Sequence, residues 1–199
     1  MTIEREAQEA RRYGGEIGDQ GFVRQSFHWL RYYLLPGLRL SRTKQPLWVV
    51  VQAVVVQGDE VLLVKRTTPR AWEIPGGFPE PKEWLLDAVV REVREETGLQ
   101  VRIERFSGLY LRTGFFAHLS TVFLCAPEGG QLLPSAETLS AEFYPVDQLP
   151  RGLFPWQRQV IVDAMNGDTK PVIRRQHLGV RTVTHSLLIA LGMQAGFLR

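Results

Sequence analysis

The hydrophobic positions of this chain fall into short β-rich runs and into stretches with helical spacing. Residues 47–56 and 61–66 are β-rich, and Gly58-Asp59 between them is a hairpin signal. Two further β-rich runs, 101–111 and 116–126, follow in the second half of the chain. These runs predict two pairs of neighbouring strands.

Apolar residues at intervals of four predict a helix between the two pairs. Leu85, Val89 and Val93 recur every four residues, so one stripe of this helix faces a core. Gly98 follows the last periodic residue, where a left-handed C-cap has the lowest energetic cost for glycine. The turn formers at 75–77 indicate that a loop precedes the helix.

The last part of the pattern adds one strand and one helix. A loop at 127–137 leads to a short strand near 141–145, and residues 156–165 form an amphipathic helix closed by Asn166-Gly167. Alternating strands and helices predict an α/β fold, a mixed sheet covered by helices.

The two ends of the chain are expected to lie outside the domain at 47–167. Residues 1–46 read as an N-terminal extension with an amphipathic helix, and residues 168–199 read as a C-terminal extension. The apolar run at 182–198 is shorter than the ~20 residues of a membrane-spanning helix. These ends could pack on their own domain, build a homodimer or make peripheral contact with an anionic membrane. We favour self-packing or a homodimer, because soluble chains bury such stripes.

Composition and charge are those expected of a soluble globular protein. The chain of 199 residues has 44% hydrophobic and 23% charged residues, which is ordinary for a globular protein. Its net charge is +3, but no basic–aromatic module is evident, so no nucleic-acid partner is expected. The single cysteine, Cys125, and a polar start at residues 1–20 without a signal peptide favour a cytoplasmic location.

The predicted central helix carries the most distinctive chemistry. Arg91, Glu92, Glu95 and Glu96 lie within six residues, and the three glutamates share one sector of the helix beside its apolar stripe. Neighbouring carboxylates repel one another unless a cation binds them, and their oxygens suit Mg²⁺ or Mn²⁺. Arg91 can pair with Glu95, four residues on, while Glu83 can hold its other flank. The alternative is a solvated acidic helix face with ordinary ion pairs.

Residues 77–99 resemble the Nudix box, which reads G, five residues, E, seven residues and then R-E-U-x-E-E-x-G-U, with U aliphatic. Every fixed position is matched, by Gly77, Glu83, Arg91, Glu92, Val93, Glu95, Glu96, Gly98 and Leu99. The flanking stretches 61–77 and 141–150 are also similar to those of Nudix hydrolases. The resemblance covers about residues 47–167.

The resemblance implies a fold, a reaction and a set of roles. The fold would be a Nudix-type α/β/α sandwich, and the enzyme would hydrolyse a nucleoside diphosphate linked to another moiety, using Mg²⁺ or Mn²⁺. By this resemblance Glu92, Glu95 and Glu96 are metal ligands, Arg91 orients them, and the Gly77 carbonyl can also face a metal. Metal ions neutralise the diphosphate and activate the attacking water.

Residues outside the box are assigned more loosely. Glu137, ahead of the last predicted strand, is the candidate general base, with Glu142 as the runner-up; each can also be a plain surface carboxylate. Arg66 and Arg70 are candidate phosphate contacts. Trp72 is a candidate for stacking on a base, although an aromatic residue there can equally pack beneath the loop.

Two classes other than an enzyme stay open from the sequence. A nucleotide-binding regulatory Nudix domain is the first, but such regulators usually lose box glutamates that this chain keeps. A module attached to a membrane surface through its termini is the second. The stretch Trp72-Glu73-Ile74-Pro75 leans weakly toward ADP-ribose or a nucleotide sugar as substrate. We therefore expect a pyrophosphohydrolase that acts on phosphorus-containing acid anhydrides.

Overall fold

A computed structural model of the protein describes residues 48–67, 70–114, 117–133, 135–167 and 170–190. The amphipathic helix predicted within residues 1–46 lies outside the described residues. So does the last part of the apolar run that was predicted from residue 182 onward.

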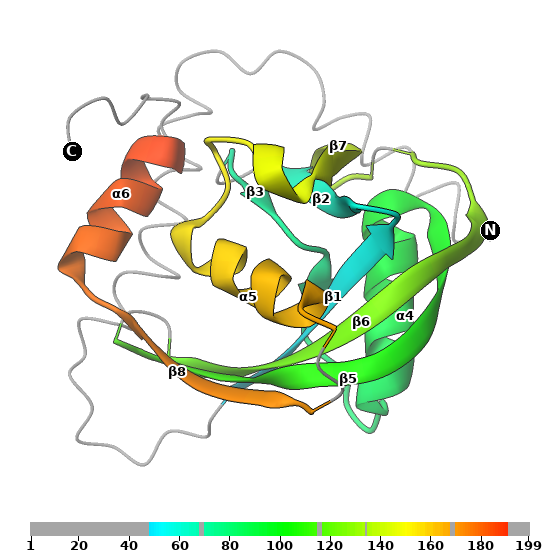
Figure 1. Cartoon of the computed structure of the whole chain (residues 1–199), viewed down its shortest axis with the longest axis horizontal. Coiled ribbons are helices and arrows are strands. Elements are labelled where there is room, and N and C mark those ends of the chain that lie inside the picture. Colours follow the sequence, from blue (N-terminus) through cyan, green and yellow to red (C-terminus); the bar gives the residue numbers. More distant parts are fainter. Residues whose placement is uncertain (1–47, 68–69, 115–116, 134, 168–169, 191–199) are drawn as a thin grey trace.

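In the described part of the chain, eight strands form one mixed sheet (Figure 1). The strands are β1 (Trp48–Gln57), β2 (Glu60–Arg66), β3 (Trp72–Glu73), β4 (Gly76–Gly77), β5 (Leu99–Gly114), β6 (His118–Gly130), β7 (Thr138–Pro145) and β8 (Val172–Leu178). The main order is β3-β2-β1-β6-β5-β8, with β4 paired to β1 and β7 paired to β2. The β1–β6 and β5–β8 pairs are parallel and the others are antiparallel.

The helices lie on both faces of this sheet and beyond its edge. They are α4 (Leu85–Thr97), α5 (Pro155–Met165) and α6 (Val180–Ala190), with a 3-10 turn, η2 (Val146–Gln148), before α5. Figure 1 shows α6 directly after β8, at the far side of the molecule from α4. Within the described ranges, no helix has the length and apolar character needed to cross a membrane.

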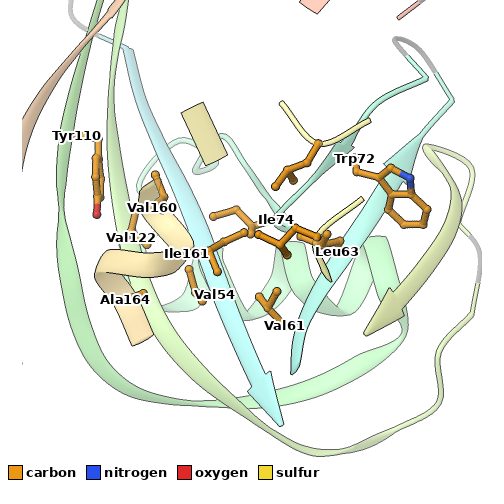
Figure 2. Close-up of a cluster of buried hydrophobic side chains, with 12 residues drawn as sticks. Val54, Val61, Leu63, Trp72, Ile74, Tyr110, Val122, Val160, Ile161 and Ala164 are labelled. Atoms are coloured by element: carbon orange, nitrogen blue, oxygen red, sulfur yellow. The ribbon is translucent and has the colours of Figure 1, made fainter. Parts of the chain in front are cut away.

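Two hydrophobic cores explain the layers, because side chains alternate between the two faces of a strand. Val51, Ala53 and Val55 of β1 pack in a cluster with Ala88, Val89 and Val93 of α4. Val54 points to the other face and packs in a cluster with Val160, Ile161 and Ala164 of α5 (Figure 2). Strands buried on both faces read as continuous apolar runs, as β1 does. The α/β/α sandwich is thereby confirmed.

Local signals in the sequence are also borne out. Gly98 adopts the left-handed conformation, with φ of +77°, and its N–H donates to the carbonyl of Arg94 at 2.8 Å. This C-cap fixes the end of α4, and β5 begins at the next residue. The loop predicted at 127–137 is shorter than expected, because pairing with β5 continues β6 as far as Gly130.

The main addition to the expected fold comes from the residues after α5. The sequence did not predict β8, which pairs in parallel with β5 from Gly108↔Val172 to Gly114↔Leu178. Its sequence, VIRRQHL, lacks the regular alternation of apolar and polar residues that predicts a strand. The segment after residue 167 therefore extends the sheet and brings α6 toward the cavity described next.

Candidate active site

A cavity of about 650 Å³ opens between α4 and the elements β5, α5, β8 and α6. One end, here called the acidic end, is lined by carboxylates: Glu73, Glu92, Glu95, Glu96 and Glu137. The other end, the Arg112 end, is lined by Gln52, Arg112, His118, Phe154, Trp156 and residues of the C-terminal elements. The cavity thus joins a negative region to a buried positive one.

A glycine turn brings the backbone against the carboxylates of α4. A Cβ on Gly77 would lie 2.6 Å from the Glu92 carboxyl carbon, so a side chain there would displace Glu92. A Cβ on Gly76 would lie 2.2 Å from the carbonyl oxygen of Val51, which forbids a side chain there as well. The Gly76 N–H donates to Glu96 Oε2 at 2.9 Å. Positions 76 and 77 must both be glycine for β1, the turn and α4 to approach this closely.

Arg91 organises the carboxylates on the solvent side of the acidic end. Its Nε and Nη2 each donate to Glu83 at 2.8 Å, and its Nη1 donates to Glu92 and to Glu95 at 3.0 Å. These charge-assisted bonds lower the pKa of Glu83 to about 2 and raise the pKa of Arg91. The predicted Arg91–Glu95 pair is confirmed, and the role of Arg91 in orienting metal ligands stays a prediction.

Glu96 is the most deeply buried carboxylate of the acidic end, with 4% of the residue exposed. Burial and the negative charge of Glu73 raise the pKa of Glu96 to about 8, against the opposing Gly76 N–H and the Arg66 charge. Arg66 Nη1 lies 3.1 Å from Glu73 and 3.4 Å from Glu96, while Nη2 lies 3.4 Å from Glu137. One guanidinium therefore links the buried carboxylate to the candidate base.

The metal-binding role of these glutamates stays a prediction. Among the residues that the structure describes, no three His, Cys, Asp or Glu side chains converge closely enough to hold an ion. Glu92 and Glu95 are turned toward Arg91, and Glu96 toward Arg66 and the Gly76 N–H. The donor set fits a hard cation in its chemistry, because it consists of carboxylate oxygens. Burial also raises the pKa of Glu92, and a bound cation would relieve that cost.

The structure brings some of the other candidates into the cavity and leaves others out. Arg66 and Glu137 line it, whereas Glu142, which accepts a hydrogen bond from Tyr144 at 2.9 Å, does not. Of the described residues, Arg70 and Trp72 are also absent from the lining. Trp72 is buried in the α5-side core (Figure 2). Its ring lies edge-on to that of Tyr144, with centroids 5.1 Å apart, so it packs beneath the loop.

Among the charged residues of the cavity, Glu73, Glu80 and Arg112 were missed by sequence reasoning. Glu73 follows Trp72 in the two-residue strand β3, and alternation turns it away from the core and toward Arg66. Arg112 lies two residues after buried Tyr110 in β5 and therefore points to the same, inward face. An arginine at an inward strand position was the available signal. Arg112 belongs to no contiguous motif, and Glu73 entered the sequence reasoning only within the stretch Trp72-Glu73-Ile74-Pro75, without a role of its own.

Comparison with known proteins places this geometry in a family. A family model described as a NUDIX domain matches residues 46–164, which is more than half of the chain. The chain belongs to the Nudix family of hydrolases. The Nudix box runs from β4 through the following loop and α4 to the first residue of β5, and five of its nine fixed residues line the cavity: Gly77, Arg91, Glu92, Glu95 and Glu96.

Individual relatives agree with the family. A MutT-like protein of Streptomyces ambofaciens is 34% identical over 129 residues, which cover 63% of this chain and 82% of the relative. An ADP-ribose pyrophosphatase of Methanocaldococcus jannaschii is 32% identical over 123 residues, covering 59% of this chain and 72% of that protein. The crystal structure of a Streptococcus suis ADP-ribose pyrophosphatase has a TM-score of 0.56 at 26% identity, over 66% of this chain and all of that one.

Proposed function

We propose that this Nudix hydrolase cleaves the diphosphate bond of a nucleoside diphosphate linked to another moiety, with ADP-ribose or a nucleotide sugar as the first candidates. The observation that carries the proposal is the cavity of about 650 Å³ beside Glu92, Glu95 and Glu96. Its volume suits a small nucleotide derivative. The names of two relatives, both ADP-ribose pyrophosphatases, support the same substrate class.

We further propose that Glu92, Glu95 and Glu96, with the Gly77 carbonyl, hold Mg²⁺ or Mn²⁺. When bound, such an ion would neutralise phosphate charge and lower the pKa of the attacking water. Arg91 keeps Glu92 and Glu95 in place through its Nη1 contacts at 3.0 Å, and the Gly76 N–H fixes Glu96. The glutamates of the box are thus pre-oriented before substrate binds.

The chain's own groups account for the movement of the proton. The nucleophilic water attacks one phosphorus atom, its proton passes to the Glu137 carboxylate, and the bridging P–O bond breaks on the opposite side. Glu137 suits this role because 71% of its side chain is exposed, so water reaches it while it remains beside Arg66 at 3.4 Å. Arg66 offers a positive charge to the phosphate oxygens as charge builds on them. The products are a nucleoside monophosphate and the phosphorylated second moiety.

A substrate panel with one variant tests this proposal. We expect the protein with MgCl₂ to release a nucleoside monophosphate from at least one of ADP-ribose, nucleotide sugars, dinucleoside polyphosphates and oxidised nucleoside triphosphates. Glu96→Gln should lower kcat at least about a hundredfold, because it removes a buried anionic oxygen donor while keeping the shape. Glu104→Gln is the matched control, since Glu104 is exposed on β5 and pairs with Arg102.

Chromatography of the nucleotide products identifies the bond that breaks, and circular dichroism checks the fold of each variant. If Glu96→Gln is folded and fully active, the box takes no part in the reaction. If no compound of the panel is cleaved, the substrate class is wrong.

A further inference from the structure

The Arg112 end of the cavity holds a buried cation whose hydrogen-bond partners are all neutral groups. Arg112 is 3% exposed; its Nε donates to Gln176 Oε1 at 3.1 Å and its Nη2 donates to Gln52 Oε1 at 3.0 Å. Its Nη1 lies 3.1 Å from His118 Nε2, which accepts in the neutral tautomer. Across the described ranges, no carboxylate oxygen forms an ion pair with Arg112.

Such an arrangement is costly unless something in the cavity compensates for it. A buried charge without a counter-ion loses its hydration and gains little from amide partners. Burial accordingly lowers the pKa of Arg112 to about 10, against the opposing charge of Glu73, and the group still carries its charge at neutral pH. A guanidinium has five N–H groups, and described residues engage three of those in Arg112. The other two have no acceptor among the described residues and can donate to a molecule in the cavity.

The strand pairing places Arg112 next to the acidic end. Gln52, which accepts from Arg112, lies opposite Gly76 in the β1–β4 pair, where Cα atoms are about 5 Å apart. The N–H of that same Gly76 donates to Glu96. The residue that contacts Arg112 and the residue that contacts Glu96 are therefore partners in one cross-strand pair. One small molecule can reach both ends of the cavity.

We propose that Arg112 binds a phosphate group of the substrate, beside the glutamates that act on the diphosphate. Phosphate matches the fork of a guanidinium and supplies the negative charge that the described partners lack. The group is either part of the diphosphate or an additional phosphate on the linked moiety. The inference rests on the proposed function, because it assigns a contact for the substrate of that site.

The elements after residue 164 hold the guanidinium in place. Gln176 of β8 accepts from Arg112 and donates through Nε2 to the Trp156 carbonyl at 3.2 Å. The Trp156 ring lies 5.7 Å from the Arg112 guanidinium carbon and stacks on Phe154, with ring centres 4.6 Å apart. Gln176, which lies beyond the matched Nudix segment, is therefore a positioning residue for Arg112.

The test is calorimetric binding of α,β-methylene-ADP, which cannot be cleaved at its bridge, in the presence of MgCl₂. Arg112→Gln should raise the Kd at least about tenfold, because it removes a charge-assisted contact. Arg112→Lys should fall in between, since it keeps the charge and loses the fork. Arg102→Gln, on the same strand but with an exposed side chain, should stay within about twofold of the unmodified protein.

Gln176→Glu guards against a variant that merely fails to fold. A carboxylate at this position would neutralise Arg112 while holding it firmly, so we expect an unchanged or higher Tm together with a Kd raised about tenfold. A purely structural role for Gln176 predicts the opposite, an unchanged Kd. The proposal would be overturned if folded Arg112→Gln, or folded Gln176→Glu, bound both α,β-methylene-ADP and ADP-ribose 2′-phosphate with wild-type affinity.

The two sources of phosphate are separated by a matched pair of ligands. If Arg112 contacts the diphosphate, Arg112→Gln weakens ADP-ribose and ADP-ribose 2′-phosphate equally. If it contacts an additional phosphate, only the second ligand is weakened. If Arg112→Gln binds both ligands as tightly as the wild-type protein does, the assignment of Arg112 is wrong. This holds even when the substrate panel and Glu96→Gln support hydrolysis at the box.

Discussion

The two ends of the cavity satisfy their charges in opposite ways. At the acidic end every box carboxylate meets an arginine or a backbone N–H: Glu83, Glu92 and Glu95 meet Arg91, and Glu96 meets Arg66 and Gly76. At the other end Arg112 is held by two amides and an imidazole. The acidic end is thus pre-arranged by its own cations, whereas the Arg112 end still has charge to offer.

This difference separates two uses of an arginine beside a cavity. Arg91 makes four contacts to three carboxylates, so its charge is consumed in holding the protein's own groups. Arg112 is buried and forms no ion pair among the described residues, and only the charge of Glu73 acts on it from beyond ion-pair distance, so its charge remains available to a ligand. An arginine that positions other residues and one that binds substrate should respond differently to substitution.

The largest expected effect concerns Glu137, the proposed base at the acidic end. Glu137→Gln should lower kcat about a hundredfold with little change in KM, because a general base contributes roughly 10²–10⁴ to the rate. Steady-state kinetics on the best substrate of the panel measures this. Glu142→Gln is the matched control, since Glu142 contacts Tyr144 and does not line the cavity.

Equal losses in the two variants would mean that the position of Glu137 beside Arg66 has no special role. A fully active Glu137→Gln would move the base to another carboxylate of the acidic end.

A smaller effect is expected from weakening the arginine that orients the box. Arg91→Lys cannot span Glu83, Glu92 and Glu95 together, because an ammonium lacks the fork of a guanidinium. The MgCl₂ concentration that gives half-maximal activity should rise about 10–100-fold, as for other residues that orient metal ligands. Arg102→Lys, at an exposed pair, should leave it unchanged. An unchanged requirement in Arg91→Lys would show that the contacts to Arg91 do not orient these glutamates.

The contrast between the two ends also explains how far the sequence could predict this molecule. Three of the five carboxylates of the acidic end, Glu92, Glu95 and Glu96, lie within the 23 consecutive residues 77–99, where helical geometry alone places them together. The two β-rich pairs and α4 were likewise foreseen, since their apolar runs and glycine turns are local signals. Short-range periodicity is sufficient for such elements.

The Arg112 end could not be predicted because its parts are far apart in the chain. Gln52, Arg112, His118, Trp156 and Gln176 come together only through the β1–β6, β5–β6 and β5–β8 pairings. The β8 strand has little periodicity of its own, and β3 and β4 have two residues each. Pairing in three dimensions, rather than local propensity, creates this end of the site.

A third prediction uses pH to measure the cost of the buried Glu96. Since the pKa of Glu96 is raised from 4.5 to about 8 in the fold, the folded state binds a proton that the unfolded chain releases within that range. Stability in chelator should therefore fall as pH rises from about 5 to 8, by at most about 1.4 kcal/mol per pH unit, and level off above.

Denaturant titrations at a series of pH values test this trend. Glu96→Gln should flatten the profile, because glutamine cannot ionise, while Glu104→Gln should not. A steep profile that persists in Glu96→Gln would assign the proton to another group.

The smallest expected effect is also the one that separates the two arginines most directly. Arg91→Met leaves three carboxylates without their shared cation and should lower the free energy of unfolding by about 2 kcal/mol. Arg112→Met removes a poorly compensated buried charge, so its loss should remain within about 1 kcal/mol of zero despite the deeper burial. Urea unfolding in chelator measures both.

If Arg112→Met lowered the free energy of unfolding more than Arg91→Met does, the guanidinium would serve the fold. A nearly neutral Arg112→Met that still weakens nucleotide binding means that the charge serves the ligand, because stability does not require it.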